Sequence, residues 1–312
     1  MKYLFWIFIA GLIIFQAIAY ALWRFAFHSP NKTQNDDHAI GDSDQLKPLA
    51  DKIHHMIDEL NSIPYEVVTI VSFDGYILHG RLYVQSPDAP FVICCHGYRG
   101  TPTRDFSAGS RIMRAMGLNL LLIEQRSHKS SEGSSITMGV KERKDCIDWI
   151  NYLSNRFGTD RKIVLCGVSM GAATVLMTAG MNLPSNVKGI IADSPYTKPK
   201  DIVLVILKNM KLPPHLCYFF LTIGCWLFGN FNLNDPMADV IDAVRKTKLP
   251  ILLIHGDSDR FVPFEMSVTL SQENEGMIDF YDFQGAGHGL SCMTDPERYE
   301  KITTEYLKRI LS

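Results

Sequence analysis

The sequence lacks the features that mark several classes of protein. Its 31 Lys and Arg are offset by 33 Asp and Glu, giving a formal net charge of −2, so the basic excess of most nucleic-acid-binding domains is missing. No H-E-x-x-H pattern, P-loop or EF-hand loop occurs, so no motif implies a metal ion or a nucleotide. We therefore expect no cofactor, no metal ion and no nucleic-acid partner.

Cysteine is scarce and shows no metal-site pattern. The seven cysteines form no C-x-x-C pair. Cys94, Cys95 and Cys166 lie inside apolar runs, where a cysteine behaves as a small hydrophobic residue. Disulfide frameworks are typical of much shorter secreted chains. We expect buried thiols, which leave the cellular compartment open.

One uncharged run is long enough to cross a membrane. It extends from Tyr3 to Trp23 and contains a single amide, Gln16, which matches the roughly 20 apolar residues that a spanning helix needs. Residues 1–28 are therefore predicted to form an N-terminal transmembrane anchor. The alternative is a cleaved signal peptide, because "AIA" and "AYA" within residues 17–21 resemble cleavage sites.

The charges that flank this run are nearly balanced. Lys2 precedes it, and Arg24 and Lys32 follow it, so the positive-inside rule discriminates weakly between the two orientations. We favour an N-in anchor, which makes the membrane a partner and places the rest of the chain outside the cell. Secretion after cleavage is the alternative.

A connecting segment follows the anchor. Residues 29–63 begin with a polar linker and continue into a predicted amphipathic helix, because Leu49, Ile53, Ile57 and Leu60 recur at helical spacing. The composition changes again at the end of this helix, where β-rich runs begin.

Residues 64–312 are predicted to form one α/β domain. Two β-rich runs joined by "FDG" indicate a hairpin, and apolar strands then alternate with helical patterns. The predicted strands after the hairpin are residues 91–95, 119–124, 162–166, 187–192, 250–255 and 277–283. Such alternation predicts a mostly parallel sheet with helices on both faces.

Strand signals are missing between residues 196 and 242. This segment includes the apolar run Leu216–Phe231, which is a little short to span a membrane. We expect a helical cap insertion that folds over the edge of the sheet. Its aromatic residues would form the core of the cap and, as a second role, line an acyl pocket.

The pentapeptide "GVSMG" places Ser169 between a strand and a helix, as a nucleophile elbow requires. The glycines at 167 and 171 suit the sharp turn. A serine nucleophile needs a base and an orienting acid. His288 follows the last predicted strand, and Asp257 and Asp259 follow the preceding one, in the order Ser, Asp, His. Asp193, at the end of another strand, is an alternative acid.

An oxyanion hole is expected beside Ser169. The segment "HGYRG", residues 96–100, turns at the end of a predicted strand. We expect the backbone N–H groups of Tyr98 and of Met170, the residue after Ser169, to bind the oxyanion.

These motifs together resemble those of the α/β-hydrolase fold, in particular the membrane-anchored or secreted serine esterase-like hydrolases of Gram-positive bacteria. The motifs are "HGYRG", "EQRSHKSSEG", "GVSMG", "DSPYT", "HGDSDRFVP" and "GAGHG". The resemblance implies Ser169 as nucleophile, His288 as base and Asp259, from the pattern H-G-x-x-D, as acid. The chain departs from the family at "EQRSHKSSEG", where Glu124 replaces Asp and Lys129 replaces Gly.

The expected function is hydrolysis of a carboxylic ester, on a small-molecule or lipid-like substrate, through an acyl-enzyme intermediate. A carboxylesterase or a lysophospholipase-like enzyme fits this expectation. An acyltransferase, a thioesterase or a peptidase could use the same three residues. A catalytically silent scaffold is disfavoured, because no member of the triad is missing.

Overall fold

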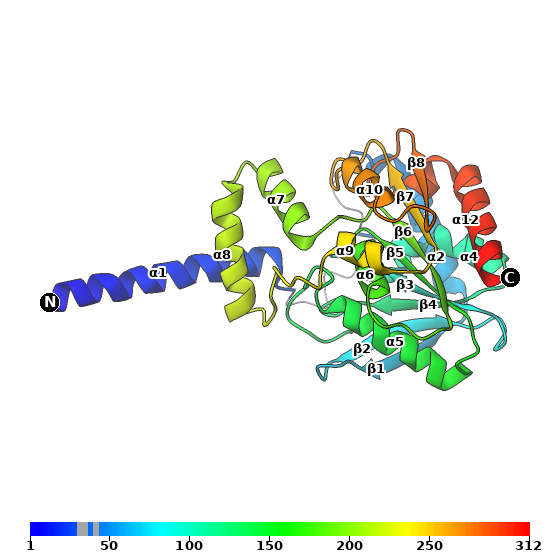
Figure 1. Ribbon diagram of the computed structural model, residues 1–312, viewed down its shortest axis with the longest axis horizontal. Helices are drawn as coiled ribbons and strands as arrows, with labels where there is room; N and C mark the ends of the chain where they lie inside the picture. The colour runs from blue at the N-terminus through cyan, green and yellow to red at the C-terminus, as the bar shows by residue number, and fades with distance from the viewer. Residues whose placement is uncertain (30–36, 40–43) are drawn as a thin grey trace.

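The computed structural model of the chain describes residues 1–29, 37–39 and 44–312. A layered α/β domain forms most of it, and helix α1 (Lys2–Ala26) projects from this domain with α7 (Pro199–Asn209) and α8 (Pro214–Leu227) near its base (Figure 1). Residues 30–36 and 40–43 of the predicted polar linker lie outside the described residues.

An eight-stranded sheet is the centre of the domain, with the order β1-β2-β4-β3-β5-β6-β7-β8. The strands are β1 Glu66–Val71, β2 Ile77–Tyr83, β3 Phe91–Cys95, β4 Asn119–Glu124, β5 Ile163–Val168, β6 Val187–Asp193, β7 Ile251–Gly256 and β8 Ile278–Phe283. Only the pairings of β2 with β1 and with β4 are antiparallel. The predicted mostly parallel sheet with an antiparallel edge hairpin is confirmed.

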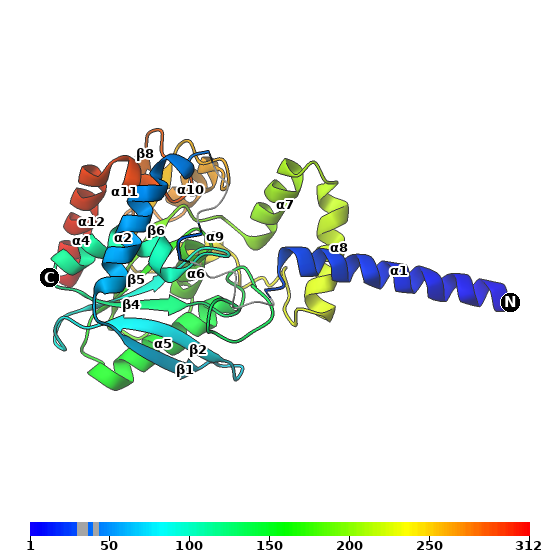
Figure 2. The ribbon, with the colours of Figure 1, turned by 180° about the vertical axis from the view of Figure 1, so that it is seen from behind.

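Helices cover both faces of the sheet, as predicted (Figure 2). Besides a 3-10 turn at Lys47–Leu49, they are α2 Ala50–Ser62, α3 Pro102–Phe106, α4 Gly109–Ala115, α5 Glu142–Phe157, α6 Met170–Ala179, α9 Val240–Lys246, α10 Phe264–Ser271, α11 Ser291–Thr294 and α12 Pro296–Leu311. One hydrophobic cluster joins α5 and α6 to the sheet, and a second joins α4 and α12 to it. The central strands β3 and β4 are buried along their whole length, which explains their continuous apolar sequence.

The C-terminal part of α1 belongs to the packed fold. Ala19 is fully buried, and Trp23 and Phe27 lie in the hydrophobic cluster on the α5 side of the sheet. The expected separation of residues 1–28 from the domain therefore needs correction at its C-terminal end. Among the described residues, α1 is the one helix long and apolar enough to cross a membrane, so it has the length and composition of a membrane anchor or a signal sequence.

The inserted segment between β6 and β7 is helical, but it packs mainly on α1. Its helix α8 lies across α1, with Gly224 so close to Ala19 that a Cβ on Gly224 would overlap the Ala19 carbonyl oxygen. Phe220 packs on Phe15, with ring centroids 5.1 Å apart. The expectation that this apolar run folds over the edge of the sheet is wrong, because α1 provides the apolar surface on which it packs.

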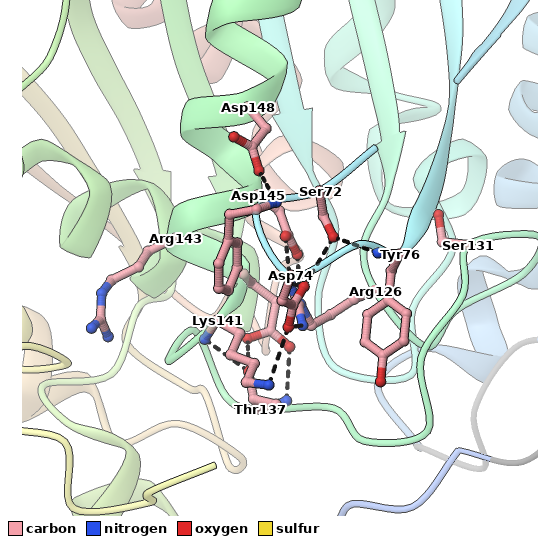
Figure 3. A network of polar contacts seen from close by, with 12 residues as sticks. Ser72, Asp74, Tyr76, Arg126, Ser131, Thr137, Lys141, Arg143, Asp145 and Asp148 are labelled. Atoms are coloured by element: carbon pink, nitrogen blue, oxygen red, sulfur yellow. Dashed lines mark hydrogen bonds and ion pairs between the residues drawn. The ribbon is translucent and has the colours of Figure 1, made fainter. Parts of the chain in front are cut away.

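A buried ion-pair network supports the loop that follows β4 (Figure 3). The side chain of Arg126 is 1% exposed, and its guanidinium donates to both carboxylate oxygens of Asp145 on α5, at 2.5 and 2.6 Å. The guanidinium also donates to both carboxylate oxygens of Asp74 in the hairpin turn, each at 3.0 Å. The ammonium group of Lys141 donates to the same carboxylate at 3.1 Å. This network fixes the loop against the hairpin and α5.

Two buried histidines join this loop to the turn after β3. The Nε2 atom of His96 accepts a hydrogen bond from the amide N–H of Gln125 at 3.1 Å. The Nε2 atom of His128 accepts one from the amide N–H of Arg99, also at 3.1 Å. Each ring donates from Nδ1 to a backbone carbonyl, at 2.8 and 2.9 Å. Both rings act as acceptors only when neutral, and burial lowers the pKa of both below the ordinary value.

The network makes a prediction about stability. Asp145→Ala removes the buried partner of Arg126 and leaves it only Asp74, whose side chain is 22% exposed. We expect a loss of about 3–5 kcal/mol in the free energy of unfolding, measured by urea denaturation of the full chain in detergent. The control is Asp88→Ala, which removes an ion pair with Arg161. The side chain of Asp88 is 81% exposed, so its loss should lower the free energy of unfolding by less than about 1 kcal/mol. Equal losses would contradict this assignment.

The histidines predict a dependence of stability on pH. Their pKa is lower in the folded chain than in the unfolded chain, so the unfolded chain binds more protons once the pH falls below about 6.5. The melting temperature should therefore decrease from pH 7 to pH 5. His128→Gln should make this decrease shallower, whereas His55→Gln, at an exposed position, should not. An unchanged slope in His128→Gln would refute the prediction.

Candidate active site

Ser169 lies in a strained turn between β5 and α6. Its backbone has φ 55° and ψ −120°, a conformation that costs free energy in a residue other than glycine. Its amide N–H donates to the Asp193 carbonyl at 2.8 Å. A Cβ on Gly167 would overlap the backbone of Gly171, and a Cβ on Gly171 would overlap the carbonyl oxygen of Cys95. The two glycines therefore permit the turn.

The structure brings Ser169, His288 and Asp259 together from three separate loops. The Ser169 hydroxyl lies 2.8 Å from Nε2 of His288, and Nδ1 of His288 lies 2.6 Å from Oδ2 of Asp259. The loops follow β5, β8 and β7, whose carboxyl ends meet at one edge of the sheet. In this arrangement the hydroxyl can donate to Nε2 while Nδ1–H donates to the carboxylate.

Asp259 is held as a carboxylate. Its Oδ1 accepts the backbone N–H groups of Phe261 and Val262, at 2.8 and 2.9 Å. Burial favours the neutral acid, but hydrogen bonds from His255 and His288 outweigh it and lower the pKa of Asp259 below its usual range. Asp259 can therefore orient His288 without taking up its proton.

His255 is a second histidine beside Asp259, which the sequence motifs did not predict. It is fully buried, and its Nε2 donates to Oδ2 of Asp259 and to the carbonyl of Val262, both at 3.1 Å. The hydroxyl of Ser267 donates to its Nδ1 at 2.6 Å. The spacing of four residues between His255 and Asp259 was visible in "HGDSD", but it did not reveal that this histidine faces the carboxylate.

The two alternative acids have other partners. Oδ1 of Asp257 accepts the amide N–H of Gly285 at 2.7 Å. Oδ1 of Asp193 accepts the hydroxyl of Ser194 at 2.9 Å, and burial raises the pKa of Asp193 to about 6. In the described part of the chain, neither carboxylate hydrogen-bonds to His288, so the geometry favours Asp259.

Two backbone N–H groups near Ser169 have no hydrogen-bond acceptor in the part of the chain that the structure describes. The amides of Gly97, Arg99 and Gly100 all have acceptors within the protein. By contrast, the amide N–H groups of Tyr98 and Met170 have no acceptor among the residues that the structure describes. The loop lies against the nucleophile candidate, because a Cβ on Gly97 would be 3.4 Å from that of Ser169.

A cavity of about 590 Å³ opens beside Ser169 and His288. Its apolar lining includes Phe106, Met113, Val168, Leu290, Cys292 and Tyr299. Asp44, Gln45 and Leu46 from the segment before α2 also line it. Within residues 1–29, 37–39 and 44–312, no group of His, Cys, Asp or Glu side chains is arranged to hold a metal ion.

The inserted helices contribute nothing to the lining of this cavity. None of the lining residues comes from the predicted cap at residues 196–242. The expectation that the aromatic residues of this segment line an acyl pocket is therefore wrong for this cavity. Instead, these residues pack on α1, as Phe219 and Phe220 do on Phe15.

Known proteins share both the sequence pattern and the fold. The sequence is 26% identical over 274 residues to the uncharacterized protein YqkD of Bacillus subtilis, covering 85% of this chain and 87% of the relative. It is 23% identical over 185 residues to the lysophosphatidylserine lipase ABHD12 of Danio rerio, covering 58% of this chain and 46% of that one.

Among solved structures, the Pyrococcus furiosus esterase Pf2001 matches with a TM-score of 0.67 at 24% identity, covering 81% of this chain and 96% of the esterase. This likeness shows the α/β-hydrolase fold. The sequence profile of the prolyl oligopeptidase family matches residues 125–312, which include both the "GVSMG" turn and the final helix. The chain is thus an α/β-hydrolase that belongs to the prolyl oligopeptidase family.

Proposed function

We propose that the protein is a serine hydrolase that cleaves carboxylic esters through an acyl-enzyme. The observation that carries the proposal is the continuous hydrogen-bonded chain from the Ser169 hydroxyl through His288 to Asp259, at 2.8 and 2.6 Å. Ser169 and His288 lie beside a cavity with apolar walls, and the amide N–H groups of Tyr98 and Met170 have no acceptor among the described residues.

The proposed reaction begins at Oγ of Ser169. Nε2 of His288 takes the hydroxyl proton as Oγ bonds to the ester carbonyl carbon, and the amides of Tyr98 and Met170 bind the developing oxyanion. His288 then gives its proton to the leaving alcohol. A water molecule, deprotonated by the same nitrogen, attacks the acyl carbon, and the C–Oγ bond breaks to release the acid as His288 returns the proton to Oγ of Ser169. Asp259 keeps the ring in the tautomer that accepts at Nε2.

A lipid-like ester is the proposed substrate. The apolar walls of the cavity, such as Phe106, Met113 and Leu290, suit a hydrocarbon chain. The cavity is also close to α1, because Tyr98 and Arg99 line it and donate hydrogen bonds to the carbonyls of Ala26 and Phe25. The lipase among the relatives supports a substrate of this class.

The N-terminal helix is proposed to remain attached as a membrane anchor, with the catalytic domain outside the cell. Cleavage after residue 19 or 21 would remove the part of α1 that packs on α8, including Phe15 and Ala19. The burial of Ala19 supports retention, because cleavage there would expose the apolar surface of α8. The competing outcome is a secreted domain that has lost most of α1.

A peptidase is the second candidate, because the matching family is that of prolyl oligopeptidase. An acyltransferase or a thioesterase would share the first half of the reaction. These activities differ in the leaving group or the acceptor, so a substrate panel separates them.

Hydrolysis of p-nitrophenyl esters by the full chain in detergent tests the proposal. Ser169→Ala should lower kcat by at least about a thousand-fold, because it removes the nucleophile. Ser258→Ala, which changes an exposed serine whose hydroxyl donates to Asp257, should retain wild-type kcat. The octanoate ester should be cleaved with a higher kcat/KM than the acetate ester, because its chain reaches the apolar walls.

Three results would count against the proposal. Hydrolysis by Ser169→Ala at the wild-type rate would show that Ser169 is not the nucleophile. A higher kcat/KM for the acetate ester would contradict the proposal of a lipid-like substrate but would still be consistent with an esterase. Faster turnover of a matched proline amide than of the ester would favour the peptidase.

A further inference from the structure

Helix α8 is mostly apolar, and His215 and Thr222 are its polar side chains apart from the hydroxyl of Tyr218. From Pro214 to Leu227 it contains no Asp, Glu, Lys or Arg. One face is buried in the protein, through Tyr218, Leu221 and Cys225.

The opposite side of α8 is only partly covered by the described chain, through the contact of Phe219 with Phe15. Leu216, Phe219, Trp226 and Leu227 are 57%, 52%, 72% and 43% exposed. Such a concentration of large apolar side chains marks an interaction surface in a folded protein. We call these four residues the exposed face of α8.

The position of α8 along α1 indicates what covers this face. Gly224 approaches the backbone of Ala19, Phe219 packs on Phe15, and Phe228 packs on Tyr20, the last pair with ring centroids 5.1 Å apart. A membrane-spanning helix needs roughly 20 residues in the hydrocarbon, and every such window within α1 includes residues 15 to 20. If α1 spans the bilayer, the residues that α8 contacts are therefore inside it.

The orientation and flanks of α8 fit the same location. Figure 1 and Figure 2 show α8 crosswise to α1, so it lies in the membrane plane when α1 spans the membrane. Its closest approach, at Ala19, is seven residues from Ala26, or roughly 10 Å along the helix. Lys208 and Lys211, just before α8, are exposed and suit the headgroup region, because long lysine side chains near helix ends extend to the membrane interface.

We propose that α8 lies in the lipid leaflet nearest the catalytic domain, with its exposed face against acyl chains. The partner is the bilayer itself. This inference rests on the proposal that α1 spans the membrane. The domain would then contact the membrane through two helices that cross each other, α1 and α8. Two such contacts fix the orientation of the domain relative to the membrane, which a single helix does not.

The consequence concerns the active site. Arg99 donates to the carbonyl of Phe25 at 2.9 Å, and Tyr98 donates to that of Ala26, while both residues line the cavity. A domain fixed by α1 and α8 therefore keeps the loop at residues 96–100 at the membrane surface. A lipid-like ester could enter the cavity there without crossing bulk water.

Tryptophan fluorescence in vesicles tests the proposal. The full chain is reconstituted into phosphatidylcholine vesicles with or without dibrominated acyl chains, and the emission of Trp226 is taken as the difference between the wild type and Trp226→Phe. Bromine quenches only nearby indoles, so brominated lipid should lower this emission at least about two-fold. The matched control is the emission of Trp149, obtained as the difference between the wild type and Trp149→Phe. Trp149 is fully buried on α5, so brominated lipid should not change its emission.

Trp6 near the start of α1 separates the two proposals about the membrane. Quenching of Trp6 without quenching of Trp226 would overturn the placement of α8 and leave the anchor in place. Shielding of Trp226 from both brominated lipid and aqueous acrylamide would also overturn it, in favour of a second protein copy on this face. The hydrolase proposal has its own readout, because ester hydrolysis is measured on the same samples.

Discussion

The close approach of strand β3 to helix α6 is the constraint on which the candidate active site depends. Gly171 on α6 lies so near the carbonyl of Cys95 that no side chain fits between them. This contact forces the chain to turn sharply at Ser169, which takes a left-handed φ of 55°. The turn leaves the Ser169 hydroxyl pointing to His288 and the N–H of Met170 without an acceptor among the described residues.

The remaining parts of the site are held by buried polar groups. Neutral His128 binds the amide of Arg99 and so positions the loop that carries Tyr98. Arg126, paired with two carboxylates, supports the loop that carries His128. Asp259 is positioned in the same way, because it accepts hydrogen bonds from two backbone N–H groups and from the ring of His255. Buried polar groups of this kind are rigid when every partner is present.

Much of the fold could be predicted from the sequence because it depends on local patterns. The apolar runs of β3 and β4 and the "FDG" turn specify their elements locally, and parallel strands bring the loops with Ser169, Asp259 and His288 to one edge. The partner of α8 could not be predicted, because an apolar helix can pack on any apolar surface, and here that surface is α1. His255 was missed since the direction of a buried side chain depends on packing between distant segments.

Covalent labelling of the full chain with a fluorophosphonate probe is the most direct test of the central claim, that Ser169 is an activated nucleophile. Such probes bond to a serine only when a base and an oxyanion site activate it. We expect one label, on the peptide that contains Ser169, and no label on the Ser169→Ala variant. Labelling of that variant at the wild-type rate would show that Ser169 is not the activated nucleophile.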